Sequence, residues 1–170
     1  MDNTRGAETE KTVGELYKDA SVAQNYVSQR FQQSWSRLLH STQVGVIEQY
    51  LCTENSDSVL EIAPGPARIA VDLTGVKRGV MVDYSPQMLD VASTQLEESG
   101  KSRFWTVKHG NAFKLQELSE SFDFVYTFRF IRHFRVTDRT RIYESLKSVM
   151  KDGGLLVLDV VGRKMRDRLD

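Results

Sequence analysis

The sequence predicts an α/β fold in which helices cover both faces of a doubly wound, mainly parallel sheet. Apolar segments of strand length recur along the chain at residues 59–63, 79–83, 104–108, 122–128 and 155–161. Helical patterns separate these segments, and strands that alternate with helices pair in parallel. With 170 residues, the chain is long enough for one such domain and too short for two ordinary ones.

Helical patterns also precede the first strand. Residues 19–39 carry apolar side chains mostly at helical spacings, and a second short helix follows with Val44, Ile47 and Leu51 on one face. We therefore divide the chain into a flexible N-terminus (1–15), N-terminal helices (16–52) and a sheet-containing core (53–170).

The helices of the core have recognisable boundaries. At residues 85–98, Ser85 can cap the N-terminus, Pro86 suits the first helical position and Gly100 suits the position after the end. A later helix is expected at residues 137–150, with Thr137 as its cap. The pair at 153–154, Gly-Gly, is expected to make the turn into the fifth strand.

Composition excludes several classes of protein. Lys plus Arg equals Asp plus Glu at 23 each, which gives no electrostatic case for binding nucleic acid. Cys52 is the only cysteine, so no disulfide can close within the chain, and a reduced, cytoplasmic setting is expected. Residues 1–15 lack the apolar run of a signal peptide, and no stretch is apolar enough to span a bilayer. No cluster of Cys and His and no carboxylate pair has metal-ligand spacing, so no metal is expected.

The loop after the first strand is the first place to expect a ligand, because doubly wound sheets bind ligands beyond the carboxyl ends of their strands. It reads EIAPGPA at residues 61–67, where Gly65 and two alanines let the backbone approach a ligand closely. Asp83 ends the second strand 22 residues after Glu61, and a carboxylate there can accept hydrogen bonds from ribose hydroxyls. Glu61 suits a cationic cofactor and would repel a pyrophosphate.

A dinucleotide fingerprint, GxGxxG, is the obvious rival interpretation of this loop. At its three glycine positions the chain has Ala63, Gly65 and Arg68, and an arginine does not fit the third, which permits close packing of helix and strand. The two prolines of the loop have no N–H groups to offer a phosphate. An NAD-dependent oxidoreductase is therefore the less favoured alternative.

Five segments follow one another between residues 59 and 161: VLEIAPGPARIA, GVMVDYSPQMLDVA, VKHGNAFKL, FDFVYTFRFIRHF and LKSVMKDGGLLVLDVV. In order and spacing they resemble the motifs of class I S-adenosylmethionine (SAM)-dependent methyltransferases. The resemblance implies a Rossmann-like fold, SAM as cofactor, and transfer of its methyl group by in-line displacement to a small-molecule acceptor.

The resemblance also implies which residues hold the cofactor: Glu61, Ala63, Pro64, Gly65, Asp83, Tyr84, Met88, Asn111, Ala112, Phe113 and Phe128. Asp83 would bind the ribose, Tyr84 and Met88 would flank the adenine, and Asn111 would bind the adenine amino group. Core packing is the alternative for Met88 and for the two phenylalanines.

Three positions depart from the family pattern. Ala63 and Ala67 replace two usual glycines, which alanine tolerates where the backbone angles stay negative, and Asn111 replaces the usual aspartate. The segment before the sheet resembles the helix that folds over the cofactor in many such enzymes. Tyr17, Tyr26 and Arg30 are its candidate cofactor contacts, and packing between helices is the alternative role for them.

Arginines crowd the segment after the fourth strand: Arg129, Arg132, Arg135, Arg139 and Arg141, with His133 among them. In the resembled family this region faces the transferred methyl group. Arg129 or Arg132 would then bind an anionic acceptor, with His133 as general base. A solvated loop and helix face is the alternative, and it is favoured for Arg139 and Arg141.

The resembled family continues its sheet after strand five with a helix and two more strands, which we expect to be absent from this chain. We therefore expect the chain to be truncated after strand five or to be one domain of a larger enzyme. Strand five would then be an exposed edge that a homodimer or a larger polypeptide could cover. The alternative function is a SAM-binding domain or subunit without catalysis.

Overall fold

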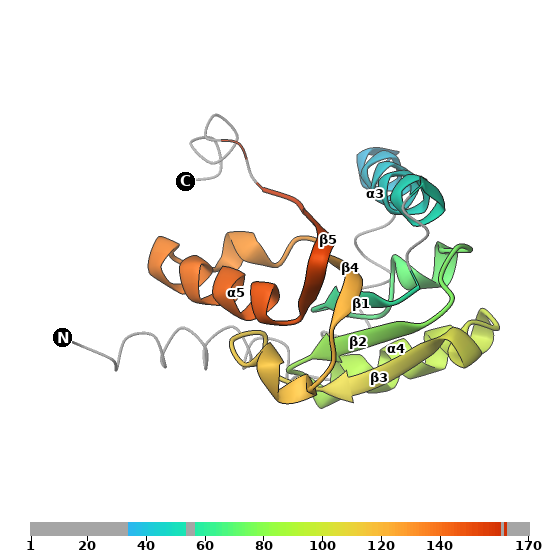
Figure 1. Cartoon of the computed structure of the whole chain (residues 1–170). Coiled ribbons are helices and arrows are strands. Elements are labelled where there is room, and N and C mark those ends of the chain that lie inside the picture. Colours follow the sequence, from blue (N-terminus) through green and yellow to red (C-terminus); the bar gives the residue numbers. More distant parts are fainter. Residues whose placement is uncertain (1–33, 54–56, 161, 163–170) are drawn as a thin grey trace.

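The computed structural model describes residues 34–53, 57–160 and 162, and these form one α/β layer structure (Figure 1). Its strands are β1 (Val59–Ile62), β2 (Gly79–Asp83), β3 (Trp105–His109), β4 (Phe122–Thr127) and β5 (Met150–Leu158). They form a sheet in the order β3-β2-β1-β4-β5, and every neighbouring pair is parallel. The α/β prediction with a parallel sheet is confirmed.

The helices lie before the first strand and between later ones. They are α3 (Ser34–Thr53), α4 (Pro86–Glu98) and α5 (Val136–Ser148), with short 3-10 turns η1 (Ala70–Asp72), η2 (Ser102–Phe104), η3 (Leu115–Leu118) and η4 (Ile131–His133). The predicted boundaries of α4 are confirmed, because the Ser85 side chain accepts a hydrogen bond from the Met88 N–H and Gly100 has a φ of +70° just past the end. None of the helices in the described part of the chain is long and apolar enough to cross a membrane.

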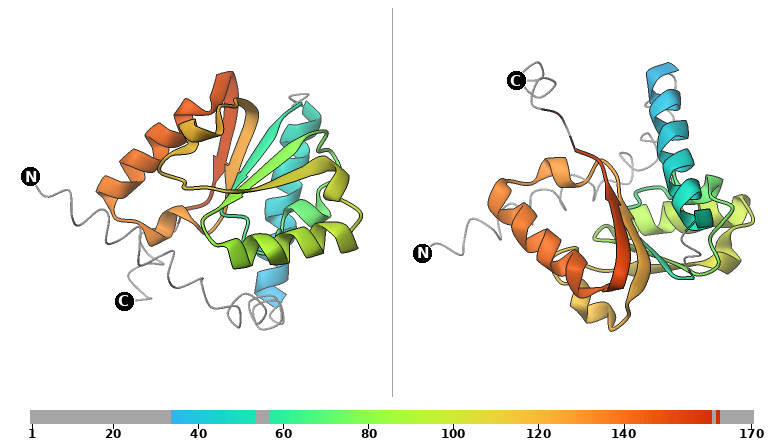
Figure 2. Two further views of the ribbon diagram at one scale, coloured as in Figure 1. Left: turned by 90° about the horizontal axis from the view of Figure 1, so that it is seen from below. Right: turned by 45° about the horizontal axis from the view of Figure 1, so that its top comes forward.

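Two apolar cores lie on opposite faces of the sheet. On one face, Ile47 and Leu51 of α3 and Ala92 of α4 pack against strand residues that include Tyr126. On the other face, Ile142 and Leu146 of α5 pack against the opposite side chains of the strands. Figure 2 shows this arrangement, with α3 and α4 on one side of the sheet and α5 on the other. Helices therefore cover both faces, as the apolar strands predict.

The predicted break between two N-terminal helices is wrong for the described residues, since α3 runs without interruption from Ser34 to Thr53. The buried residues Gln43, Ile47 and Leu51 share one face of this helix at four-residue spacing. This buried stripe continues across the predicted boundary. The rest of the pattern at residues 19–39 lies outside the described residues.

The predicted cap of α5 is also wrong. The helix begins at Val136, with Arg135 at the cap position and no side-chain hydrogen bond there. Thr137 consequently lies inside the first turn, where Asp138 is buried and faces Arg141 at 3.9 Å. Acidic Asp138 suits this position because the N-terminal end of a helix favours negative charge.

Gly153 and Gly154 lie within β5 and do not form the turn that leads into it. The pairing with β4 shifts at this point, from Phe122 opposite Met150 to Phe124 opposite Leu155, so the glycines make an irregularity of the bulge type. Gly153 has a φ of +77°. Among the described strands β5 lies at the sheet edge, and the partner expected to cover this edge stays a prediction.

Strand order determines where a ligand can bind. From β1 the chain moves outward through β2 to β3, then returns to the other side of β1 for β4 and β5. The connections therefore diverge at the carboxyl ends of β1 and β4 and leave a crevice between them.

Candidate functional site

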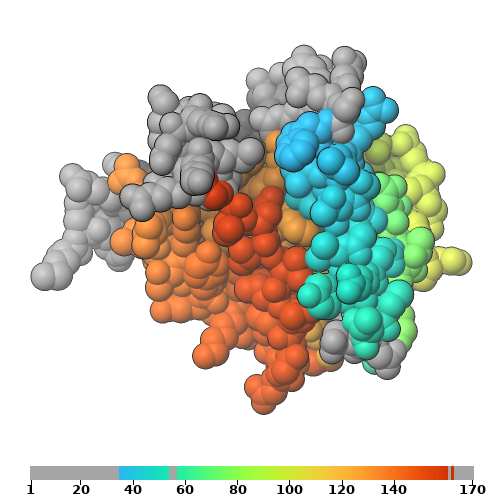
Figure 3. Space-filling model, turned by 90° about the horizontal axis from the view of Figure 1, so that it is seen from above, coloured from blue at the N-terminus to red at the C-terminus, as the bar shows by residue number. Residues whose placement is uncertain are grey.

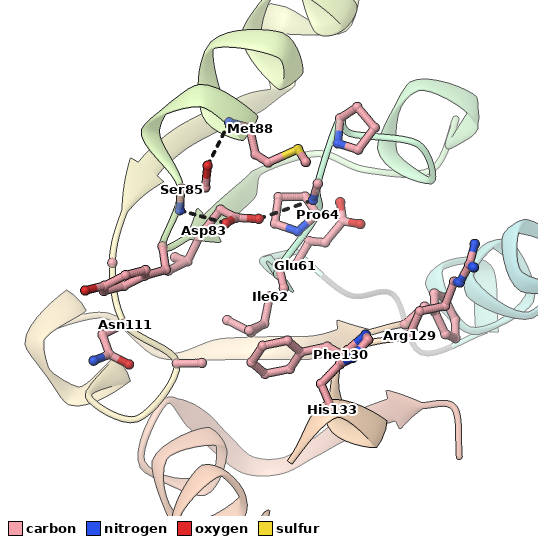
Figure 4. A pocket seen from close by; sticks show the side chains of 18 of the residues that line it. Glu61, Ile62, Pro64, Asp83, Ser85, Met88, Asn111, Arg129, Phe130 and His133 are labelled. Atoms are coloured by element: carbon pink, nitrogen blue, oxygen red, sulfur yellow. Dashed lines mark hydrogen bonds between the residues drawn. The ribbon is translucent and has the colours of Figure 1, made fainter. Parts of the chain in front are cut away.

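A pocket opens at the carboxyl ends of the central strands, and Figure 4 shows the side chains that line it. We call its first side the β1–β3 wall, formed by lining residues within 61–69, 82–88 and 110–113. We call its second side the β4 wall, formed by Phe128, Arg129, Phe130, His133 and Phe134. In Figure 4, Asp83 and Met88 lie on one side and Phe130 and His133 on the other, with Ile62 between them. The pocket thus occupies the crevice where the strand order reverses.

The loop after β1 takes three left-handed residues in alternation: Ala63 (φ 53°), Gly65 (φ 56°) and Ala67 (φ 57°). The condition under which alanine is tolerated at these positions, a negative φ angle, is therefore not met. A side chain in this region costs roughly 1–2 kcal/mol because its Cβ crowds the following carbonyl oxygen. The loop keeps the backbone course that glycines would give, at a cost in stability.

Asp83, at the end of β2, stabilises the conformation of this loop through a hydrogen bond. Its Oδ2 accepts a hydrogen bond from the Gly65 N–H at 3.3 Å, and its Oδ1 accepts one from the Ser85 N–H at 2.9 Å. Burial raises the pKa of Asp83 above its usual value, and the hydrogen bonds from Ser85 and Gly65 oppose this rise. Carboxylate oxygens have further lone pairs, so Asp83 can still accept hydrogen bonds from a ligand in the pocket.

Glu61 brings an acid into the core at the base of the pocket. It is 4% exposed and pairs in register with Met81 on β2 and Tyr126 on β4. Among the described residues, neither its Oε2 nor the Tyr126 hydroxyl makes a hydrogen bond. Burial raises the pKa of Glu61 from 4.5 to about 7, although the charge of Arg68 lowers it and the charge of Asp83 adds to the rise. A buried carboxyl with an unsatisfied oxygen, lining a pocket, is suited to meet a positively charged ligand.

The loop after β3 completes the first wall. Asn111 Oδ1 accepts a hydrogen bond from the Phe113 N–H at 2.9 Å, so its amide shapes the turn. Gly110 is required by packing, because a Cβ there would lie 2.8 Å from Val82 Cγ1. The oxygen of Asn111 can accept a second hydrogen bond, so its expected contact with an adenine amino group stays a prediction.

Aromatic rings shape the β4 wall. The rings of Phe130 and Phe134 meet edge to face with their centroids 4.8 Å apart. The rings of Phe113 and Phe134 meet in the same way with their centroids 5.5 Å apart. Arg129 has a φ of 60°, and its backbone N–H donates to Asp159 Oδ1 at 2.6 Å. This wall therefore combines apolar rings with a guanidinium and an imidazole.

The structure brings every residue expected at the cofactor into this one pocket, from Glu61 to Phe128, together with Arg129 and His133. What each of them binds stays a prediction. Arg132 is exposed and does not line the pocket. The expected lid residues Tyr17, Tyr26 and Arg30 lie outside the described residues.

Several lining residues were not expected from the sequence: Ile62, Pro66, Arg68, Ile69, Val82, Ser85, Gly110, Phe130 and Phe134. The segment FDFVYTFRFIRHF did contain a signal for two of them, because Phe130 and Phe134 follow the strand on either side of a short turn, η4. Arg68 carried no such signal, since its partners on α3 are 25 and 28 residues away.

Comparison with known proteins agrees with this geometry. Residues 59–154 match the family model described as "Methyltransferase domain", whereas a search of curated proteins with the sequence finds no match. Among solved structures, a DhpI–SAH complex aligns with a TM-score of 0.67 at 18% identity, over 92% of this chain and 70% of that one.

Two further structures align with lower coverage of their own length. An O-methyltransferase family protein from Burkholderia thailandensis gives a TM-score of 0.59 at 15% identity, over 71% of this chain and 37% of that one. The glycopeptide N-methyltransferase MtfA complexed with sinefungin gives 0.60 at 19% identity, over 70% and 49%. This chain therefore spans less than half the length of those two proteins. Because the family model covers more than half of the chain, the protein belongs to the methyltransferase domain family, the class I SAM-dependent methyltransferases.

Proposed function

We propose that this chain binds SAM along the β1–β3 wall and transfers its methyl group to a small molecule whose anionic group is held by Arg129. One observation carries the proposal: Arg129 and His133 share a single pocket with Glu61 and Asp83. A cofactor and an acceptor bound on the two walls would therefore meet in the space between them.

The first wall fits SAM on chemical grounds. SAM supplies a methyl group on a positively charged sulfonium, and it also carries an ammonium group. Glu61, buried and with an unsatisfied oxygen, would be stabilised in its ionised form by these positive charges. Asp83 presents its carboxylate beside the loop, where it would accept hydrogen bonds from the ribose hydroxyls. Pro64 and Pro66 offer no N–H groups, which suits a cofactor without phosphates.

The second wall indicates the class of acceptor. The Arg129 guanidinium can form paired hydrogen bonds with a carboxylate, sulfonate or phosphate. The rings of Phe130 and Phe134 give an apolar surface beside it, which suits an acceptor with a flat or apolar body. His133 would accept the proton of a hydroxyl acceptor, whereas an amine that is already neutral would not need a base. Orientation of the acceptor in line with the methyl group would supply most of the rate enhancement.

Calorimetry and turnover test this proposal in sequence. We expect SAM to bind and NAD not to bind when each is titrated into the protein, because the loop lacks a phosphate cradle. Turnover is then measured with a panel of matched acceptors that differ only in the presence of an anionic group. Preference for the neutral members of the panel would contradict the role given to Arg129.

The variant Arg129→Ala separates cofactor binding from catalysis. We expect SAM affinity to change by less than about threefold, while kcat/KM for an anionic acceptor falls roughly 10- to 100-fold, as for loss of one charged hydrogen bond. Arg135→Ala is the matched control, because Arg135 is exposed and does not line the pocket. Unchanged turnover in Arg129→Ala would remove this arginine from the site.

A SAM-binding domain without catalysis is the second candidate function. SAM binding without turnover of any acceptor, in the presence of the full natural polypeptide, would support this second function over the first.

A further inference from the structure

The turn that follows β4 is stabilised by a hydrogen bond to a residue 30 positions later in the chain. Arg129 has a left-handed backbone conformation, with a φ of 60°, which residues other than glycine rarely adopt. Its N–H donates to Asp159 Oδ1 at 2.6 Å, and Asp159 directly follows β5. This hydrogen bond to a charged acceptor offsets the conformational cost. The same turn leads Phe130 and His133 into the β4 wall.

The second oxygen of Asp159 connects this turn to α3. Gln43 Nε2 donates to Asp159 Oδ2 at 3.4 Å, and Gln43 Oε1 accepts from Arg68 Nη2 at 2.7 Å. Gln43 is 4% exposed. Its amide can satisfy both neighbours in only one orientation, since a reversed amide would place donors against the Arg68 guanidinium. Figure 3 shows α3 beside the end of β5, where this contact is made.

Arg68 continues the chain of hydrogen bonds into the first wall of the pocket. Arg68 Nη1 contacts His40 Nδ1 at 2.7 Å, and His40 Nε2 contacts Asp72 Oδ2 at 2.6 Å. A guanidinium only donates, so Nδ1 of His40 accepts and the ring proton lies on Nε2, facing the Asp72 carboxylate. His40 and Gln43 of α3 therefore both accept hydrogen bonds from the Arg68 guanidinium and fix its position.

We propose that Asp159 and Gln43 are positioning residues that couple the two walls of the pocket through α3. No described residue of α3 lines the pocket, yet this helix contacts Arg68 of the β1–β3 wall and, through Asp159, the Arg129 turn of the β4 wall. A ligand that orders the loop around Arg68 would consequently also order the turn at Arg129. The assignment of the two walls to cofactor and acceptor rests on the proposed function, whereas the hydrogen-bonded connection does not.

Hydrogen exchange measured by mass spectrometry tests the hold on the Arg129 turn without any ligand. In Asp159→Ala we expect amides in peptides covering residues 128–134 to exchange about tenfold faster or more, as for loss of a charged hydrogen bond. The matched control is Asp152→Ala, since Asp152 is an exposed aspartate on β5, and this variant should leave these peptides unchanged. Peptides covering β2 report global stability, and their exchange should not change. Equal exchange rates in Asp159→Ala and Asp152→Ala would overturn the positioning role.

Asp159→Asn separates positioning from coupling. Its amide oxygen can still accept from the Arg129 N–H, but its NH2 group then meets the NH2 group of Gln43, and rotation of Gln43 would break the bond to Arg68. We expect exchange at residues 128–134 close to wild type in this variant without SAM. If Asp159→Ala proves globally unstable, Asp159→Asn and Gln43→Ala still test the coupling between the two walls in the experiment with SAM.

Addition of SAM tests the coupling. SAM should slow exchange at residues 128–134 in the wild type, and this protection should be largely lost in Gln43→Ala and in Asp159→Asn although both still bind SAM by calorimetry. Equal SAM-induced protection in wild type and Gln43→Ala would refute the coupling. Failure of the wild type to bind SAM would refute the proposed function instead, and the ligand-free exchange of Asp159→Ala would still decide the role of Asp159.

Discussion

Replacement of Glu61 by glutamine should remove a specific pH dependence from the stability of the ligand-free protein. Burial raises the pKa of Glu61 from 4.5 to about 7, so between these values the folded chain keeps a proton that the unfolded chain has lost. For a carboxyl whose pKa is raised on folding, the folded state is not penalised below pH 4.5 and loses stability as the pH rises through 7. At about 1.4 kcal/mol per pH unit, the full difference is about 3.5 kcal/mol.

Urea denaturation at pH 5 and pH 8 measures this effect in the wild type and in Glu61→Gln, which keeps the shape of the side chain and cannot ionise. Between these pH values the wild type should lose about 2 to 3 kcal/mol more free energy of unfolding than the variant. The comparison between the two proteins cancels the contributions of other titrating groups, including Asp83, whose pKa is also raised.

The same experiment in the presence of saturating SAM adds a second readout. Positive charge on the cofactor favours the ionised carboxylate, so the pH-dependent loss in the wild type should shrink when SAM is bound. If Glu61→Gln loses as much stability as the wild type from pH 5 to pH 8, Glu61 does not hold the buried proton, and the reasoning from its burial is refuted.

Further predictions concern backbone strain and packing. Ala63→Gly should raise the free energy of unfolding by about 0.5–1 kcal/mol, since relief of the left-handed strain exceeds the entropy that glycine adds to the unfolded chain. Ala67→Gly should gain less free energy of unfolding, because the methyl group of Ala67 is fully buried and its loss removes apolar contacts. A lower free energy of unfolding in Ala63→Gly would contradict the argument from backbone strain. Gly79→Ala should cost about 2–3 kcal/mol, because its Cβ would lie 2.3 Å from the ring of Trp105 on β3. Gly45→Ala, in α3 with no atom near its Cβ, should instead stabilise the protein by about 1 kcal/mol, and equal effects of the two glycine variants in urea denaturation would refute the packing argument.

Much of the fold could be read from local patterns. Short apolar runs separated by helical spacings predicted all five strands, and Ser85 and Gly100 marked the ends of α4 correctly. The pairing of the loop at Gly65 with Asp83 at the end of the next strand also predicted where the pocket lies. These features are visible in the sequence because each depends on residues close together in the chain or on a fixed strand–helix spacing.

Other features depend on which distant residues meet in space. The order of the strands places Glu61 opposite Tyr126, and the buried face of α3 continues through a predicted break. The left-handed angle of Ala63 follows from the course that the loop must take between strand and helix, against the preference of alanine itself.

The hydrogen bonds that join Arg68, Gln43 and Asp159 connect residues separated by 25 and 116 positions. No periodicity or motif marks such partners in the sequence. Only the packing of α3 against the ends of the strands brings these polar groups within hydrogen-bond distance and partly shields them from water, and hydrogen bonds gain strength where water is excluded.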